Sequence, residues 1–224
     1  MGEPPAWRGT TSPFTSLGMI SSKSEREMPP EEAEKRGPIQ LVGEHLFASR
    51  TVLVFGEINV LLAESVTAQL LALAAQSRDP IRLVINSPGG HVESGDTMHD
   101  VVRWLDAEVH AIATGWCASA GALVFAGAKR ENRLALPNTR FLLHQPLGGV
   151  GGPASDVEIE ARQVLLMRER LNHIFAEATG QPLEKIARDT DRNHWMSAQE
   201  ALDYGLVGRI LSASRDLDWS VCSR

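Results

Sequence analysis

Thr114-Gly-Trp-Cys-Ala-Ser-Ala-Gly-Ala-Leu-Val124 decides the fold of this 224-residue chain and carries its most informative serine. The β-favouring run 109–114 leads into the stretch, which turns at Gly115 and continues as small residues and helix formers to Ala128. Ser119 is therefore predicted to lie where a strand gives way to a helix. That position suits a nucleophile, because the unpaired N–H groups of a helix N-terminus stabilise a developing oxyanion. The alternative is that Ser119 only caps the helix, as serines often do.

The composition indicates a single domain with a sizeable core, since 43% of the residues are apolar. A net charge of −6 without a dense Lys/Arg run argues against a nucleic-acid partner. The two cysteines, Cys117 and Cys222, make no disulfide framework, which fits a reducing cytoplasm. No apolar run reaches the roughly 18 residues that span a bilayer, and no signal peptide is seen. No His, Cys or acidic cluster has metal-ligand spacing, so no metal and no membrane are expected.

Strands and helices are predicted to alternate, which favours an α/β fold with a largely parallel sheet. We expect a disordered segment over 1–38, one domain over 39–215 and a tail over 216–224. The predicted strands are 51–55, 81–85, 109–114, 133–136, 139–143 and 206–211. The predicted helices are 61–77, 92–106, 119–128, 153–178 and a short last one opened by the capping box Ser197-x-x-Glu200.

A serine nucleophile needs a base, and His144 is the best placed of the seven histidines. It ends a predicted strand and is followed by a flexible glycine loop, although a solvated histidine at a strand end is an equal alternative. Asn86-Ser-Pro-Gly-Gly90 follows another strand, and its glycines allow backbone N–H groups to approach a ligand closely. An oxyanion hole, an anion nest and an ordinary turn all remain open for this loop.

Several short motifs follow one another in a fixed order. They are Ile85-Asn-Ser-Pro-Gly-Gly90, Gly115-x-x-Ala-Ser-Ala-Gly-Ala122, Leu136-Pro-Asn-x-Arg140, His144-Gln-Pro-Leu-Gly-Gly149, Thr179-Gly-Gln, Asp189-Thr-Asp-Arg192 and Glu200-Ala-x-x-Tyr-Gly-Leu206. Through them, residues 51–211 resemble the proteolytic subunit of Clp protease, the ClpP family. The resemblance implies a serine endopeptidase built as a ClpP/crotonase-like spiral of ββα units. It also implies two stacked heptameric rings around a chamber, into which an AAA+ unfoldase feeds unfolded polypeptides. The unfoldase uses the ATP, so this chain needs no cofactor of its own.

The resemblance also assigns roles to residues. Ser119 matches the nucleophile, His144 the general base, and Gly90 and Ala120 the two backbone donors of the oxyanion hole. A groove that takes substrate as an added strand is implied at His91, Val92, Leu147, Gly148 and Gly149.

Two further regions match the assembly parts of the family. The helix from Pro153 corresponds to the handle by which rings stack. Its apolar stripe, Val157, Ala161, Val164, Leu171 and Phe175, would more often pack within its own domain. Asp191 and Arg192 correspond to the acidic–arginine pair that couples ring stacking to the active site.

The chain departs from the family at the third triad residue, where Asn193 stands in place of the usual Asp. An asparagine can orient a histidine through its carbonyl oxygen, but it supplies no negative charge for the imidazolium. The same Asp-to-Asn exchange in a serine protease lowers kcat by about 10⁴. A weak peptidase is therefore expected. Arg82 and Val84 replace aromatic residues of the unfoldase-docking strand, and the segment before Thr51 matches the family poorly, so docking of the usual unfoldase is in doubt.

Other functions stay open at this point. One is a weakly active or inactive ring subunit that assembles with and regulates an active paralogue. An acyl-CoA enzyme of the related crotonase fold is another, although the Ser119 and His144 pattern argues against it. An α/β-hydrolase would need Gly-x-Ser-x-Gly and a different chain order. Cys117 could also be the nucleophile, but the hypothesis that it is a small buried residue is the stronger one.

Overall fold

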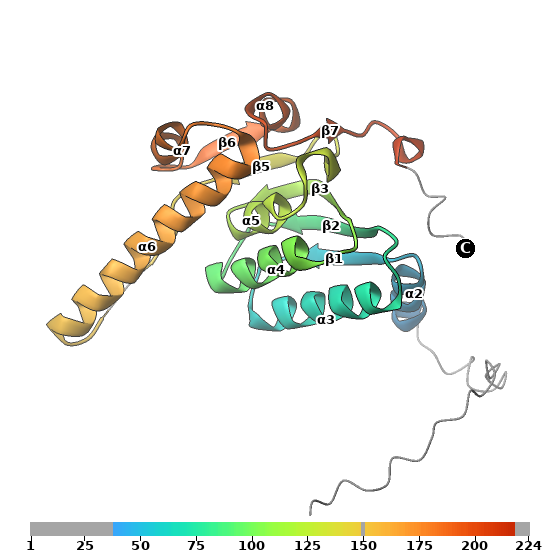
Figure 1. The fold of residues 1–224 in the computed structure, drawn as a ribbon, viewed down its shortest axis with the longest axis horizontal. Helices are drawn as coiled ribbons and strands as arrows, with labels where there is room; N and C mark the ends of the chain where they lie inside the picture. Colours follow the sequence, from blue (N-terminus) through green and yellow to red (C-terminus); the bar gives the residue numbers. More distant parts are fainter. Residues whose placement is uncertain (1–37, 149–150, 218–224) are drawn as a thin grey trace, which may run out of the picture. The chain divides into compact units, whose positions relative to one another are not determined.

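The computed structural model describes residues 38–148 and 151–217 (Figure 1). The predicted segment 1–38 and tail 216–224 therefore lie almost entirely outside the described residues and stay predictions. The helices are α2 (Pro38–Ala48), α3 (Val60–Gln76), α4 (Val92–Trp104), α5 (Ala120–Ala126), α6 (Ala154–Thr179), α7 (Leu183–Asp189) and α8 (Ala198–Tyr204). The strands are β1 (Thr51–Phe55), β2 (Ile81–Ser87), β3 (Val109–Ala118), β4 (Arg133–Ala135), β5 (Arg140–Leu143), β6 (His194–Ser197) and β7 (Arg209–Ile210).

The strands form one sheet in which β3 has three neighbours. The order β1-β2-β3-β4-β7 is parallel throughout. The first half of β3 pairs with β4, while its last residues pair with β5. β5 in turn pairs with β6, and this is the antiparallel pair of the sheet. The prediction of an α/β fold with a largely parallel sheet is confirmed.

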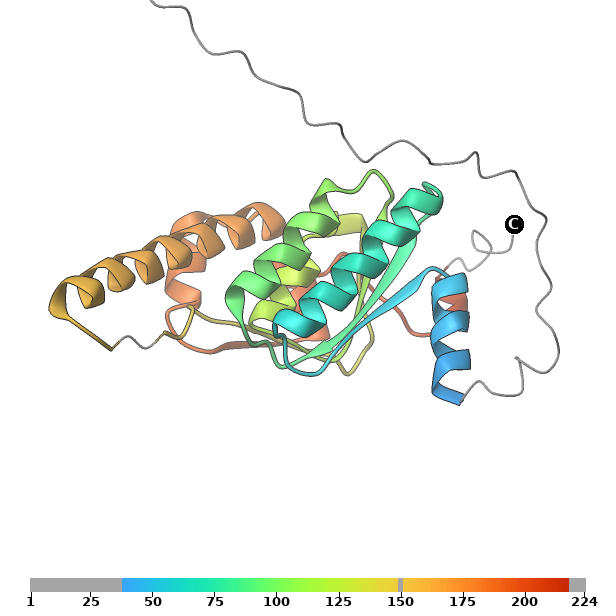
Figure 2. The ribbon, with the colours of Figure 1, turned by 90° about the horizontal axis from the view of Figure 1, so that it is seen from below.

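Helices α3, α4 and α5 lie side by side over one face of the sheet (Figures 1 and 2). The main core is buried between these layers and includes Leu70, Leu83 and Val124. β2 has an almost continuous buried pattern, as expected for a parallel strand covered on its faces. The second half of α6 joins this core through Leu171 and Phe175, and the rest of the helix extends away from the sheet (Figure 1).

One sequence prediction at the centre of the fold is wrong. The chain does not turn at Gly115, because β3 runs on to Ala118. The reason is a break in the β2–β3 register between Ile85 and Ser87, which lets β3 absorb extra residues around Gly115. Gly115 has φ +59, and the Asn86 side-chain oxygen accepts a hydrogen bond from the Trp116 N–H at 3.1 Å. The strand therefore continues past the irregularity and delivers Ser119 at its end.

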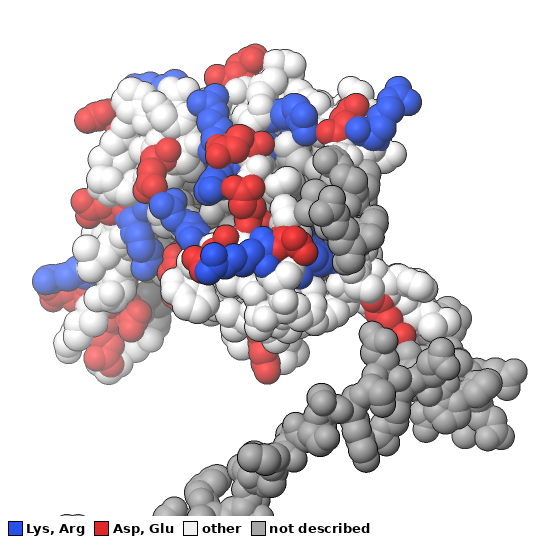
Figure 3. All heavy atoms as spheres, turned by 45° about the vertical axis from the view of Figure 1, so that its right-hand side comes forward, with Lys and Arg blue, Asp and Glu red and all other residues white. Residues whose placement is uncertain are grey.

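No helix in the described part of the chain is long and apolar enough to cross a membrane. On the face seen in Figure 3, Lys and Arg side chains are interspersed with Asp and Glu rather than gathered by sign.

Candidate active site

Ser119 lies between the end of β3 and the start of α5, as the sequence predicts. It occupies the N-cap position, but its side chain makes no capping hydrogen bond. Its backbone has φ 54 and ψ −122, a conformation that a residue with a Cβ adopts only at a cost of about 1–3 kcal/mol. Strain of this kind is found where a functional side chain must point in a set direction. Ser119 is therefore at the N-cap position, as the alternative predicts, but its hydroxyl does not cap the helix.

Three side chains from distant parts of the chain form one hydrogen-bonded line. Ser119 Oγ lies 2.8 Å from Nε2 of His144. Nδ1 of His144 lies 3.1 Å from the side-chain oxygen of Asn193. An amide oxygen only accepts, so Nδ1 carries the ring proton and Nε2 keeps its lone pair for the Ser119 hydroxyl. The arrangement has the nucleophile, base and orienting group that acyl transfer from a peptide requires.

Strand pairing brings the last two of these residues together. In the antiparallel β5–β6 pair, Leu143 lies opposite His194, so the residues just beyond, His144 and Asn193, meet at the strand ends. Gln145 strengthens this junction. Its backbone N–H donates to the Thr190 carbonyl and its side-chain amide donates to the Asp191 carbonyl, each at 2.7 Å. Sequence analysis did not single out Gln145.

The glycine loop packs directly on the nucleophile. A Cβ on Gly89 would lie 2.5 Å from Ser119 Cβ and 3.1 Å from the Ala120 nitrogen. The next residue, Gly90, has φ +147 and is bridged to Ile58. Within the described residues, no backbone hydrogen bond uses the N–H of Gly90 or of Ala120. Two unused N–H groups beside a serine hydroxyl are what an oxyanion hole needs.

The predicted groove residues differ in exposure and in whether their backbone groups already form hydrogen bonds. The backbone N–H of His91 donates to Ile58, and its carbonyl accepts from Gly95, so both groups already bond within the chain. Leu147 is 84% exposed, Gly148 is also exposed, and Gly149 lies outside the described residues. Beside Ser119 and His144 is an apolar pocket that sequence analysis missed. Its other lining residues are Val92, Ala120, Leu123, Pro146, Leu171 and Phe175.

Among the described residues of this single subunit no ion pair joins Asp191 to Arg192, and their predicted role in ring stacking stays a prediction. Asp191 instead forms an ion pair with Arg168 of α6, at 3.1 Å. Because Asp191 is two residues before Asn193, this ion pair ties the loop that carries the orienting amide to the long helix. Arg168 was not identified from the sequence, since nothing in its local pattern distinguishes it from other exposed charges on a helix.

Cys117 is unsuited to be a nucleophile. Its side chain is fully buried, and its Sγ–H donates weakly to the Gly121 carbonyl. Burial raises the pKa of the Cys117 thiol, which therefore stays protonated.

Comparison with known proteins agrees with this geometry. A model of the Clp protease family matches residues 33–214. The chain belongs to the Clp protease family. It is 61% identical to the ATP-dependent Clp protease proteolytic subunit 3 of Rhizobium etli, over 77% of this chain and 89% of that protein. It is 59% identical to the proteolytic subunit 2 of Gluconobacter oxydans, over 80% and 82% of the two chains.

Solved structures of the Clp protease family share the fold. ClpP1 from Listeria monocytogenes has 48% identity and a TM-score of 0.72, and covers 79% of this chain and 99% of its own. An Asn-to-Asp mutant of the same ClpP1 has a TM-score of 0.74 at the same identity and coverage. The ClpP-like fold class is thereby confirmed. As a homologue of Clp protease proteolytic subunits, the chain is a peptidase subunit by family.

Proposed function

We propose that this chain is a serine endopeptidase subunit that hydrolyses unfolded polypeptides to peptides. The observation that carries the proposal is the contact of 2.8 Å between Ser119 Oγ and His144 Nε2, with Asn193 on the other ring nitrogen. In the first step Ser119 Oγ attacks the peptide carbonyl carbon while its proton passes to His144 Nε2. The backbone N–H groups of Gly90 and Ala120 stabilise the oxyanion.

His144 then donates that proton to the leaving amine, and the C–N bond breaks. Water attacks the acyl-Ser119 ester with His144 again as base, which releases the acid and restores the serine. Asn193 holds the ring in the correct tautomer but leaves the imidazolium without a counter-charge, so we expect slow turnover. None of these steps needs a metal or a nucleotide held by this chain.

The apolar pocket supports a preference in cleavage, but its volume is about 10 Å³ in this structure, so its lining must move apart to take a substrate side chain. Val92, Leu123 and Pro146, together with Leu171 and Phe175 of α6, border Ser119 and His144. An apolar side chain on the acyl side of the scissile bond would exchange water for these contacts, at about 25 cal/mol per Å² buried. We therefore assign apolar residues to this position of the substrate.

We further propose that the subunit works in two stacked rings with an AAA+ unfoldase, which uses the ATP. The support is α6, whose first half leaves Ile159 58%, Leu165 63% and Leu166 52% exposed. Apolar side chains gathered on a protruding helix are typical of a surface that another subunit covers. This half of the helix corresponds to the predicted handle.

A second candidate is a subunit that mainly regulates an active paralogue in a mixed ring. It is favoured by Asn193 and by Arg82, which stands in the predicted docking strand. Arg82 is buried, and its side chain donates to Thr51 Oγ1 and to the Ser49 carbonyl. The Arg82 side chain therefore binds residues of its own chain, where the family has an aromatic side chain on the docking strand.

Labelling with a fluorophosphonate probe, followed by native mass measurement, tests both candidates. The wild-type protein should be labelled, and Ser119→Ala should lose the label while keeping its circular dichroism spectrum. Cys117→Ala is the control, since it removes the neighbouring buried thiol and should stay labelled. Unchanged labelling of Ser119→Ala would refute the serine assignment. Labelling only after a paralogue is added would favour the regulatory role.

A further inference from the structure

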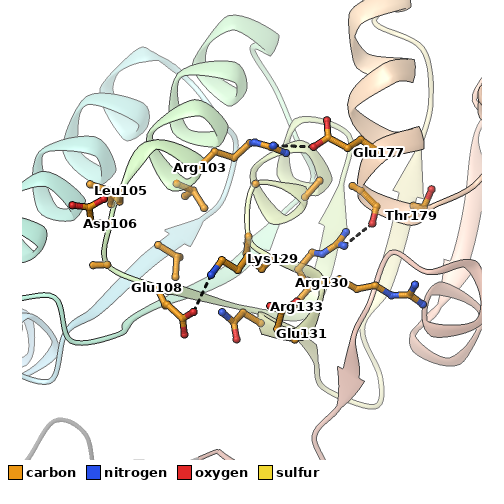
Figure 4. A pocket seen from close by; sticks show the side chains of 18 of the residues that line it. Arg103, Leu105, Asp106, Glu108, Lys129, Arg130, Glu131, Arg133, Glu177 and Thr179 are labelled. Carbon is orange, nitrogen blue, oxygen red and sulfur yellow. Dashed lines mark hydrogen bonds and ion pairs between the residues drawn. The ribbon is translucent and has the colours of Figure 1, made fainter.

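A cavity distinct from the pocket beside Ser119 lies where the α4–β3 loop, the α5–β4 loop and the last turn of α6 meet (Figure 4). Its volume is about 560 Å³, which is in the range of small-molecule sites. Charged residues of both signs line it: Arg103, Asp106, Glu108, Lys129, Arg130, Glu131, Arg133 and Glu177.

Arg133 differs from the other charged residues of the lining because it is buried, with 2% of its surface exposed. Its Nη2 donates to the Ala178 carbonyl at the end of α6, at 2.5 Å. Its Nε and Nη1 are buried without a hydrogen-bond partner among the described residues. Buried donors of a charged group are costly to leave unpaired, so Arg133 calls for an acceptor in this cavity.

Arg50 shows what a satisfied arginine looks like in this protein. It is also buried and also lies at the end of a helix, here α3. Its Nε, Nη1 and Nη2 all donate to carbonyl oxygens, which belong to Leu73, Ser77, Asp79 and Pro80. A helix end by itself can thus be closed with every guanidinium nitrogen in use. The unused nitrogens of Arg133 are a feature of the cavity and not of the helix end.

The ion pairs in the cavity wall do not include Arg133. Lys129 pairs with Glu108 at 3.0 Å, and Arg103 pairs with Glu177 at 2.8 Å (Figure 4). Asp106 pairs with Arg78, which lies outside the lining.

Glu131 is then the one lining carboxylate outside these pairs, and its charge acts on Arg133. Burial, with a smaller contribution from Arg130, lowers the pKa of Arg133 to about 10. The cavity therefore holds more positive than negative charge that is not already compensated.

We propose that this cavity binds a small oxyanion, a phosphate or carboxylate group, through Nε and Nη1 of Arg133 once the guanidinium turns toward the cavity, with Arg130 also in the lining. Oxyanions are the acceptors that match a guanidinium best, and hydrogen bonds between the two are charge-assisted. The guanidinium also binds the carbonyl end of α6, so the bound anion fixes the base of this helix. Leu171 and Phe175 of the same helix border the pocket beside Ser119. The site is independent of the proposed peptidase activity.

Thermal unfolding of the full chain tests the site, with inorganic phosphate and acetate as probes against chloride at equal ionic strength. Phosphate or acetate should raise the Tm saturably, by several degrees at about 100 times Kd. Arg133→Gln should abolish the rise, and Arg130→Gln should weaken the affinity several-fold. Arg162→Gln, which removes an exposed charge elsewhere on α6, should respond like the wild type.

Phosphorus NMR of inorganic phosphate gives a second readout that does not depend on unfolding. Its line should broaden with the wild type and with Arg162→Gln, but not with Arg133→Gln. If Arg133→Gln does not fold, Arg130→Gln decides, and wild-type affinity in that variant overturns the proposal. Absence of saturable binding to the wild type at millimolar anion also overturns it, because water then fills the cavity. Neither result bears on Ser119.

Discussion

Nδ1 of His144 lies 3.1 Å from the side-chain oxygen of Asn193, although the two residues are 49 positions apart in the chain. The amide therefore performs one of the two functions of an aspartate at this position, which is to orient the histidine ring. It selects the tautomer that leaves Nε2 open to Ser119. It does not perform the second, electrostatic function, because a neutral amide cannot stabilise the imidazolium that forms when His144 takes the serine proton.

Asn193→Asp should therefore raise kcat on a small fluorogenic peptide with an apolar residue before the cleaved bond. The gain is expected between about tenfold and 10⁴-fold, the upper bound being the loss for the reverse exchange in a serine protease. KM should change little, since the added charge acts on the imidazolium and not on bound substrate. Steady-state kinetics at pH 7 to 8 measure both constants.

Asn193→Ala is the matched control for that substitution. It removes the acceptor without adding charge, so kcat should fall below that of the wild type. If Asp and Ala at this position both leave turnover unchanged, alone and with any paralogous subunit, Asn193 has no part in the site.

Gly89→Ala should inactivate the enzyme by displacing the nucleophile. Gly89 has φ +99, and the new Cβ would lie 2.5 Å from Ser119 Cβ, far inside contact distance. Relief requires Ser119 or the loop to move, and a shift of about 1 Å can cost 10² in rate. Labelling by the fluorophosphonate probe and kcat/KM should both drop by at least about that factor.

Gly56→Ala separates this clash from backbone strain. Gly56 also has positive φ, at +83, but nothing lies within 4 Å of a Cβ placed there. Both variants should lose about 1–3 kcal/mol of stability from the strained backbone. Gly56→Ala should nevertheless keep its peptidase activity, and equal inactivation of the two would argue against contact with Ser119.

Glutamates on the exposed half of α6 should separate the rings. Ile159→Glu with Leu165→Glu places charges on side chains that are 58% and 63% exposed in the single subunit. These charges would be desolvated if a second ring covers them, so stacking should be lost while the subunit fold is kept. Native mass measurement should show single rings or smaller species.

The conservative pair Ile159→Val with Leu165→Met keeps the apolar character and should assemble as the wild type does. A glutamate variant whose mass equals that of the wild-type assembly would mean that this surface is not the ring contact.

Asp189 should contribute to stability in a pH-dependent way. Burial alone would raise its pKa, but hydrogen bonds from Lys185 and Tyr204, at 2.7 and 2.8 Å, bring it below the ordinary 3.8. A folded-state pKa below the unfolded one gives stability that is complete above the unfolded value. That stability is lost as the pH falls through the folded one. Asp189→Asn should therefore cost about 1–3 kcal/mol at pH 7, with a smaller penalty below about pH 3.

Asp203→Asn is the control, because it removes the same charge from an exposed position of α8. Urea unfolding at pH 7, 5 and 3 compares the two variants. A penalty for Asp189→Asn that does not shrink toward pH 3 would show that the carboxylate contributes through packing and not through its charge.

Most elements could be predicted because their signals are local. The bounds predicted for β2 from its buried run, and for α3 from its spaced leucines, agree with the structure within two residues. The capping box at Ser197 and Glu200 is present and opens α8. α7, of seven residues, and β6, of four, were missed, since such short segments hold too few apolar positions to show a period. The eleven-residue α2 was missed as well, and the strand predicted over 206–211 is only the two-residue β7.

The residues of the candidate site likewise divide into those with a local sequence signal and those without one. Ser119 and His144 were found because each follows a strand and precedes either a helix or a glycine loop. The role of Asn193 came from resemblance alone, since its own surroundings are polar and exposed. The contacts of Gln145, Arg168 and Gly89 were invisible to sequence analysis, because none of them follows a period or a motif.

By itself, the sequence determined that this protein alternates strands and helices and places a serine at a strand–helix junction ahead of a histidine. Only the tertiary structure decided that β3 passes Gly115, that Asn193 meets His144 and that Arg133 is buried with unused donors. The physical reason is that hydrophobic periodicity and capping act over one or two turns of chain. Strand register and burial depend on which distant segments pack together, and those contacts leave no local trace.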